Sequence, residues 1–439
     1  MASALLRRTG LAAGTATLGL ALVVGAGVLA APSTPAASTR DTEVTPAGST
    51  DPLDRQVAAL QDRLRRLPQD WVGHATLGAA FVELSRRNAD PSLYAKAEQA
   101  LQTSLRLHPA DNSAAHSGLA TLAAARHDFK LALEHADRSL SVNAFHAATH
   151  GVRGDALLEL GRYEEAYAAF QRMVDLRPGT ASYARASYAW EVRGQLERAI
   201  ETMEAALEAA SAVADTSFAA YHLSLLHLET GDVAAAERVV AGGLRRDPES
   251  FNLALASAKV AIAKGDLETA AAGYQKVTVG APAASTLTEY GDLLAALGRT
   301  EEAKAQYQAA RDFNALEEKA GVSLDADAVL LDADLGDPAA AMRTAQKLRE
   351  AQGTSIFTED AYAWALHANG RHAEAMRHAD SALRIGTRSA LLRFHRGMIA
   401  KSLGDRDKAR ADLTAALEIN PHFSLRLAPI ARKALAELG

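Results

Sequence analysis

The sequence predicts an all-α protein in which helical hairpins stack into a solenoid, and three observations indicate this fold. One short pattern, a Gly followed by four mostly polar residues and an Ala, recurs along the chain, and its copies lie about 34 residues apart. The composition is 48% hydrophobic but only 5% aromatic, so the core must consist mainly of small aliphatic side chains. A period of this length is typical of helix pairs that bury their apolar faces against neighbouring pairs.

The repeated pattern occurs nine times between His127 and Ala409. The steps between successive copies are 34, 33, 37, 34, 33, 38, 34 and 34 residues. One copy, His127/Ala132, has His in place of the glycine. The other pairs are Gly161/Ala166, Gly194/Ala199, Gly231/Ala236, Gly265/Ala270, Gly298/Ala303, Gly336/Ala341, Gly370/Ala375 and Gly404/Ala409.

Each position of the pattern has a physical explanation. The glycine ends the first helix of a pair because the tight turn needs a residue that tolerates positive φ. The alanine lies where the two helices cross closely, and a larger side chain would push them apart. A proline after the second helix removes a backbone donor and stops that helix. Such prolines are Pro109, Pro178, Pro248, Pro282 and Pro421.

The pattern resembles the tetratricopeptide repeat, and the resemblance covers roughly residues 70–421. An earlier, more divergent unit begins at Trp71. The resemblance implies a right-handed superhelix of about ten helix pairs. The clearest unit, residues 147–178, carries Gly154, Gly161, Ala166, Phe170 and Pro178.

Two stretches interrupt the regular period. The longer steps place extra residues near 211–217 and 314–323, where we expect extended second helices or longer links. The unit around residues 325–335 is weak because Asp332 and Asp334 occupy first-helix positions that are usually apolar. This unit is therefore expected to be a looser joint in the solenoid, because it packs less tightly against its neighbours.

The N-terminal residues predict export. Arg7 and Arg8 precede residues 11–31, an uncharged stretch that as a helix would be about 32 Å long, enough to span a bilayer. We therefore expect residues 1–31 to be a cleaved signal peptide or a retained membrane anchor, and the repeats to lie outside the cytoplasm. The absence of cysteine excludes disulfides and a bacterial lipoprotein anchor.

The remaining segments follow from their composition. Residues 32–52 are rich in Pro, Ser and Thr and are expected to form a disordered linker. Residues 53–69 carry an apolar stripe at helical spacing and are expected to form an N-terminal capping helix. The repeat array follows over residues 70–421, and residues 422–439 are expected to contain a C-terminal capping helix.

Charge and motifs limit the possible functions. The net charge is −6, and it becomes −8 without Arg7 and Arg8, which disfavours nucleic acid and anionic lipid as partners. The chain has no G-x-S-x-G, H-E-x-x-H or P-loop motif. We therefore expect a non-enzymatic protein without a cofactor, which binds a protein or peptide in the bacterial cell envelope.

The resemblance also implies where that partner binds, because the first helices of such repeats line a concave groove. Phe218, Phe357 and Phe394 lie near the implied positions and are expected to add exposed aromatic surface. The Lys and Asn clamp with which some relatives hold a C-terminal carboxylate is absent. The implied groove residues are Asp155, Tyr188, Glu191, Tyr221, Lys259, Asp292, Trp364 and His367.

An alternative hypothesis is metal binding. His146 and His150 are four residues apart, and His116 occupies the same repeat position as His150, one unit earlier. Three imidazoles could hold zinc or nickel. The other interpretation is that these histidines replace bulky aromatic residues and pack between helices.

Overall fold

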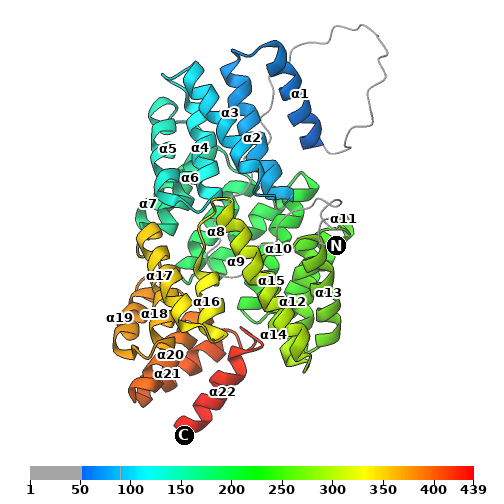
Figure 1. The fold of residues 1–439 in the computed structure, drawn as a ribbon. Coiled ribbons are helices and arrows are strands. Elements are labelled where there is room, and N and C mark those ends of the chain that lie inside the picture. The colour runs from blue at the N-terminus through cyan, green and yellow to red at the C-terminus, as the bar shows by residue number, and fades with distance from the viewer. Residues whose placement is uncertain (1–51, 89) are drawn as a thin grey trace.

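A computed structural model describes residues 52–88 and 90–439, and within these residues the chain forms 22 helices and no strand (Figure 1). Ten helical hairpins, here called units 1 to 10, follow α1 (Pro52–Arg66) and precede α22 (Leu427–Leu438). None of the helices in this described part is long and apolar enough to cross a membrane. The predicted leader, residues 1–31, and all but the last residue of the predicted linker lie outside the described residues.

The two helices of each unit alternate along the chain. The first helices are α2 (Trp71–Asn88), α4 (Ser113–Ala125), α6 (Ala147–Glu159), α8 (Thr180–Val192), α10 (Val213–Glu229), α12 (Phe251–Ala263), α14 (Ala284–Ala296), α16 (Ala326–Asp334), α18 (Ile356–Ala368) and α20 (Ala390–Leu403). The second helices are α3 (Leu93–Leu107), α5 (Phe129–Val142), α7 (Tyr163–Leu176), α9 (Leu196–Glu208), α11 (Val233–Arg246), α13 (Leu267–Gly280), α15 (Thr300–Lys319), α17 (Pro338–Gln352), α19 (His372–Ala382) and α21 (Arg406–Ile419).

The turn between the two helices has the geometry that the sequence predicts. All eight turn glycines have positive φ, from 71° at Gly194 to 91° at Gly336, and His127 takes the same conformation at 58°. The paired alanines are buried, with 0% exposure at most positions and 2% at Ala303. The Gly-to-Ala pattern therefore marks a sharp turn followed by a close helix crossing in units 2 to 10.

The two longer steps are accommodated in different ways. Helix α15 has 20 residues and is an extended second helix, as expected. In unit 5, by contrast, the extra residues lengthen the first helix, α10, which has 17 residues. Unit 8 has a first helix of only nine residues, and its Asp332 accepts a hydrogen bond from Arg311 Nε at 3.0 Å. In this unit polar contacts replace part of the usual apolar packing.

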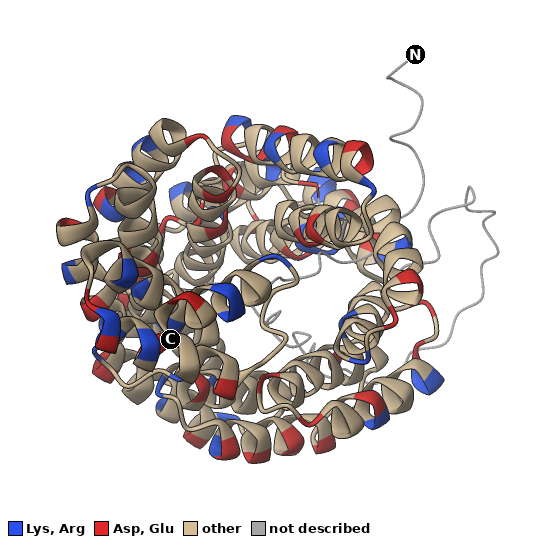
Figure 2. Cartoon of the chain, turned by 90° about the horizontal axis from the view of Figure 1, so that it is seen from below, with Lys and Arg blue, Asp and Glu red and all other residues tan. Residues whose placement is uncertain are grey.

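The hairpins curve into a ring around an open interior, which is visible along the superhelix axis (Figure 2). The curvature brings later units against earlier ones. The backbone N–H of Ser323 donates to the carbonyl oxygen of Arg126 at 3.0 Å, and the N–H of Ile356 donates to the Tyr163 hydroxyl at 2.7 Å. Further along, Asn420 Nδ2 donates to Glu229 Oε2 at 3.4 Å. We call this line of contacts the seam.

The seam has a constant register. These three contacts join residues that are 197, 193 and 191 positions apart in the chain. In each case the turn region inside one unit meets the junction that follows the unit five places further on. One superhelical turn therefore takes about five and a half units, and the register is kept from unit 2 to the end of unit 10.

Two turn glycines lie in the seam itself. A Cβ added at Gly161 would lie 2.9 Å from the carbonyl oxygen of Thr354, and one added at Gly194 would lie 2.5 Å from that of Gly386. A Cβ at Gly298 would meet nothing within 4 Å, although φ is similar there. The glycine at 194 is thus required both by the turn and by the neighbouring superhelical turn.

This pair of glycines provides a test of the seam. We expect Gly298→Ala to destabilise the fold by about 1 kcal/mol, because only the strain of positive φ is added. Gly194→Ala should cost more, since its Cβ would also press on the backbone at Gly386 and push the two superhelical turns apart. Urea denaturation gives the two losses, and small-angle scattering would show a wider ring for Gly194→Ala only. Equal losses with unchanged scattering would contradict a seam that holds the ring closed.

Candidate functional site

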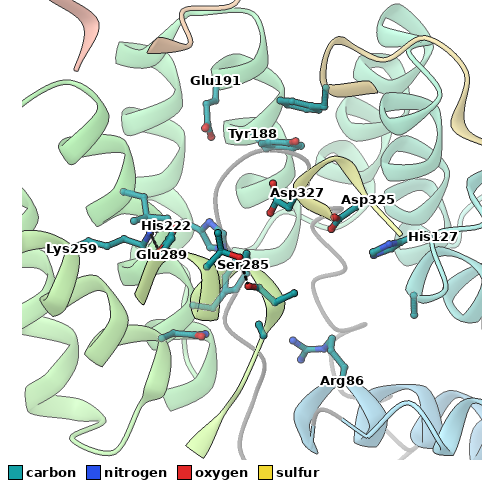
Figure 3. Close-up of a pocket in the computed structure, with 18 of the residues that line it drawn as sticks. Arg86, His127, Tyr188, Glu191, His222, Lys259, Ser285, Glu289, Asp325 and Asp327 are labelled. Carbon is teal, nitrogen blue, oxygen red and sulfur yellow. Dashed lines mark hydrogen bonds and ion pairs between the residues drawn. The ribbon is translucent and has the colours of Figure 1, made fainter. Parts of the chain in front are cut away.

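The interior of the ring contains a cavity of about 960 Å³. The first helix of every unit contributes to its wall, and so do residues 420–427 after the last unit. Figure 3 shows side chains from opposite walls directed into this space, among them Tyr188, His222, Lys259, Asp327 and Arg86. The cavity is therefore a property of the whole array and of no single hairpin.

One wall carries an ordered charge network. Lys259 Nζ contacts both carboxylate oxygens of Glu289, at 2.7 and 2.6 Å, and the Tyr274 hydroxyl donates to the same carboxylate at 2.8 Å. Lys259 lies on α12 and Glu289 on α14, so the ion pair joins units 6 and 7 across the wall. This network gives the wall fixed polar groups with a defined orientation.

Glu191 and Glu317 also lie in the wall, and among the described residues neither forms an ion pair. Burial, together with the nearby Glu229, raises the pKa of Glu191 to about 7. Burial and the charge of Asp325 likewise raise the pKa of Glu317 to about 7, and burial raises the pKa of Asp327 well above its usual value. At neutral pH about half of the Glu191 and Glu317 carboxyl groups are protonated, so they can donate hydrogen bonds as well as accept them.

His222 also faces the cavity. Burial lowers its pKa to about 4, so the imidazole is neutral at physiological pH. Its ring packs on Phe218 at 4.4 Å between centroids and against the edge of Tyr221 at 5.1 Å. The wall near α10 therefore offers an apolar surface with a neutral ring nitrogen.

Four of the predicted groove residues line the cavity, namely Tyr188, Glu191, Lys259 and Asp292. Phe218 and Phe357 line it as well, whereas Phe394 is in the core with 1% exposure. Whether any of these residues contacts a partner stays a prediction. Their common position is the concave side of the first helices.

The other four predicted residues do not line the cavity. Tyr221 is 1% exposed and Trp364 is 8% exposed, so neither ring is the exposed anchor that the sequence suggested. His367 stacks on Trp364 at 4.8 Å. Asp155 is buried in an ion pair with Arg185, at 2.8 Å from Nη2 to Oδ2, and each side chain is 2% exposed. In these units the implied groove position faces the neighbouring helix.

A second row of residues lines the cavity and was not among the predicted groove positions. His222, Glu289 and Asp327 all lie nine positions before their turn glycine and three before the row that was predicted. Residues three apart share one face of a helix, so extending the predicted row by one turn would have found them. Arg426 was missed for another reason, since it lies outside the repeats.

The structure does not bring the three candidate metal ligands together. His116 Nδ1 lies 3.2 Å from His135 Nδ1, while the ring of His146 contacts Thr149 and that of His150 contacts the carbonyl oxygen of Ala144. Among the residues described, no group of three or more His, Cys, Asp or Glu could hold a metal ion. The metal hypothesis therefore has no geometric support from His116, His146 and His150.

Comparison with known families agrees with the repeated geometry. A profile described as tetratricopeptide repeat matches residues 117–181, 152–215 and 221–285, and a second profile with that description matches residues 390–423. The chain contains tetratricopeptide repeats. The matched segments cover units 3, 4, 6 and 10, and most of units 2 and 5. Tetratricopeptide repeats form interaction scaffolds for other proteins, and they bind on their concave surfaces.

Solved structures with a similar fold have low sequence identity. The Cut9–Hcn1 hetero-tetramer of the APC/C is 12% identical with a TM-score of 0.43, over 88% of this chain and 81% of that chain. A tetratricopeptide repeat protein from Parabacteroides merdae is 17% identical with a TM-score of 0.35, over 59% of this chain and 98% of that one. A protein from Thermus thermophilus is 19% identical, with a TM-score of 0.38 and coverages of 44% and 98%. Each is a likeness of fold alone, and no curated protein matches this chain.

The buried Asp155–Arg185 pair gives one testable consequence for the tetratricopeptide array. Asp155→Ala leaves a buried guanidinium without its carboxylate, so we expect a loss of about 3 to 5 kcal/mol of stability. The matched control is Asp137→Ala, which removes an exposed pair with Arg153 and should cost less than about 1 kcal/mol. Chemical denaturation measures both. A fully stable Asp155→Ala protein would show that this residue is a surface position after all.

A second consequence concerns pH. The pKa of Glu191 is about 7 in the folded protein and near 4.5 in an unfolded chain, so the folded state binds more protons between these values. The group's contribution to stability is therefore complete below about pH 4.5 and is lost as pH rises through 7. Glu191→Gln should remove this loss and be more stable than the wild type at pH 8, by about 1 to 3 kcal/mol.

Urea denaturation at pH 4.5, 6 and 8 measures the effect. Glu318→Gln changes an exposed glutamate of α15 and is the control. The same pH dependence in wild type and Glu191→Gln would contradict a raised pKa of Glu191 in the folded protein.

Proposed function

We propose that this protein is a non-enzymatic scaffold of the bacterial cell envelope that holds a segment of a partner protein inside its ring. The observation that carries the proposal is the interior cavity of about 960 Å³, whose wall includes residues from every unit. An extended segment can contact many units at once, whereas a compact ligand can contact only a few. The family's use of its concave surface supports the same location.

The chemistry of the wall supports a peptide as the occupant. Fixed polar groups such as the Lys259–Glu289 pair alternate with apolar surface around His222 and Phe218. A polypeptide offers both backbone hydrogen-bonding groups and apolar side chains, so it can satisfy both kinds of surface. The sequence has no G-x-S-x-G, H-E-x-x-H or P-loop motif, which favours binding over catalysis.

The envelope location rests on the sequence pattern of residues 1–31. Two arginines before an uncharged apolar stretch of bilayer-spanning length favour translocation of the repeats that lie C-terminal to it. Export would place the ring between the cytoplasmic membrane and the outside, either released or tethered by this segment. The partner would then be another envelope protein or an exported peptide.

A blocked interior tests the proposal. Ser285 on α14 faces the cavity, and Ser285→Trp should fill part of it and prevent a partner from entering (Figure 3). Ser141→Trp places the same ring at an exposed position of α5 that does not line the cavity, and it serves as the matched control. Circular dichroism establishes that both variants fold.

The measurement is cross-linking on intact spheroplasts with a membrane-impermeant reagent, followed by mass spectrometry. We expect a protein that is captured by the wild type and by Ser141→Trp, and lost with Ser285→Trp. Equal capture by all three would contradict binding in the interior. Capture only after lysis would contradict the envelope location.

A further inference from the structure

The chain does not leave the ring after its last unit. Helix α21 ends at Ile419, and residues 420–426 then run without helical structure along the interior before α22 begins at Leu427. All seven of these residues line the cavity. The loop before α22 lies beside α14 and α16 in Figure 1. A non-helical segment of the protein itself therefore occupies part of the space in which a partner would bind.

The segment enters the interior at the seam. Asn420 donates to Glu229 of unit 5 and so continues the seam register at the junction between α21 and α22. Phe423 then packs on Phe394 at 5.7 Å between ring centroids, and Leu425 packs on the apolar cluster formed by α10 to α15. The segment thus contacts units that lie far apart in the sequence.

Arg426 is the most strongly held residue of the segment. Its Nη2 contacts Asp334 Oδ2 at 2.5 Å, and its Nε contacts Asp292 Oδ1 at 3.2 Å. The two carboxylates come from α14 and α16, and their side chains are only 14% and 8% exposed. One guanidinium therefore neutralises two carboxylates that have little access to water.

The carboxylates are fixed in place by their own neighbours. The Tyr307 hydroxyl donates to Asp292 Oδ1 at 2.8 Å, and Trp364 Nε1 donates to Asp334 Oδ1 at 2.7 Å. The acceptors for Arg426 are thus oriented by residues of units 7 and 9, and they do not depend on the segment. We call Asp292, Tyr307, Asp334 and Trp364 the arginine seat.

The geometry of the seat favours arginine over lysine. The guanidinium is planar and directs several N–H groups at fixed angles, so it can reach two separate carboxylates at once. An ammonium group is a compact, strongly hydrated charge that loses more hydration on burial. Without a cation the two buried carboxylates would be left unpaired, which is costly.

We propose that the arginine seat is a binding subsite of the interior, filled in this structure by the chain's own Arg426, and that a partner binds with a non-helical segment carrying arginine that displaces residues 420–426. The order Leu425-Arg426, with the leucine on an apolar cluster and the arginine in the seat, defines the partner chemistry as an apolar residue followed by arginine. The displacement of residues 420–426 by a partner rests on the proposed function, whereas the preference of the arginine seat for arginine over lysine does not.

The test uses a synthetic peptide with the sequence of residues 419–428 and blocked ends as the probe. Arg426→Gln empties the seat in the full chain, and fluorescence anisotropy should then show binding of the labelled peptide. Wild-type protein should bind it about tenfold or more weakly, because its own segment competes. A peptide with lysine in place of the arginine should also bind about tenfold or more weakly to the variant.

Two further variants separate the seat from general effects. Adding Asp334→Asn to Arg426→Gln should abolish the preference for the arginine peptide. Lys433→Gln, an exposed change on α22, should behave as the wild type.

If Arg426→Gln does not fold, Arg426→Lys replaces it. Hydrogen exchange of residues 420–426 in the wild type then provides a second readout, since excess arginine peptide should accelerate their exchange.

The outcomes distinguish the two proposals. Equal binding of the arginine and lysine peptides, or no peptide binding to a folded Arg426→Gln or Arg426→Lys protein, would overturn the seat. If the peptides show no preference for arginine but Ser285→Trp still abolishes partner capture, the proposed scaffold function holds and the arginine seat is not a binding subsite. If the peptide binds with the expected preference but no partner is captured, the seat stands and the proposed function fails.

Discussion

The structure depends on the close crossing of the two helices in each unit. An alanine without exposed surface lets the helices approach, and a glycine with positive φ turns the chain sharply enough for them to meet. Repeated along the array, this crossing sets the curvature of the stack. A wider crossing would give a more open superhelix, in which later units would not meet earlier ones.

The curvature has two results that belong to the array as a whole. It closes the seam, so that units five places apart support each other in addition to their direct neighbours. It also encloses the interior, where the pKa of carboxyl groups such as Glu191 rises to about 7 because they have less access to water. Stability in an open solenoid is a sum over neighbouring repeats, whereas here contacts between superhelical turns add to that sum.

Local features of this fold could be predicted from the sequence, and features that depend on the superhelix could not. The turn glycines and crossing alanines act within one hairpin, so their spacing was sufficient to place them. The seam depends on small rotations added over five units, which no residue pattern reports. For the same reason Tyr221 and Trp364 were expected to face the groove, although the stacking of neighbouring units buries them. Arg426 has no repeat position, and only the three-dimensional path of residues 420–426 brings it to Asp292 and Asp334.

The seam also bears on how the array can change in evolution. Open repeat arrays can lengthen or shorten when recombination between similar copies adds or removes a unit. In this ring, an insertion between Tyr163 and Ile356 would move every later junction away from its facing turn. The contacts would then form in a different register or would be lost. The number of units in one superhelical turn is thus constrained by geometry, while units added beyond either end of the array meet no such restriction.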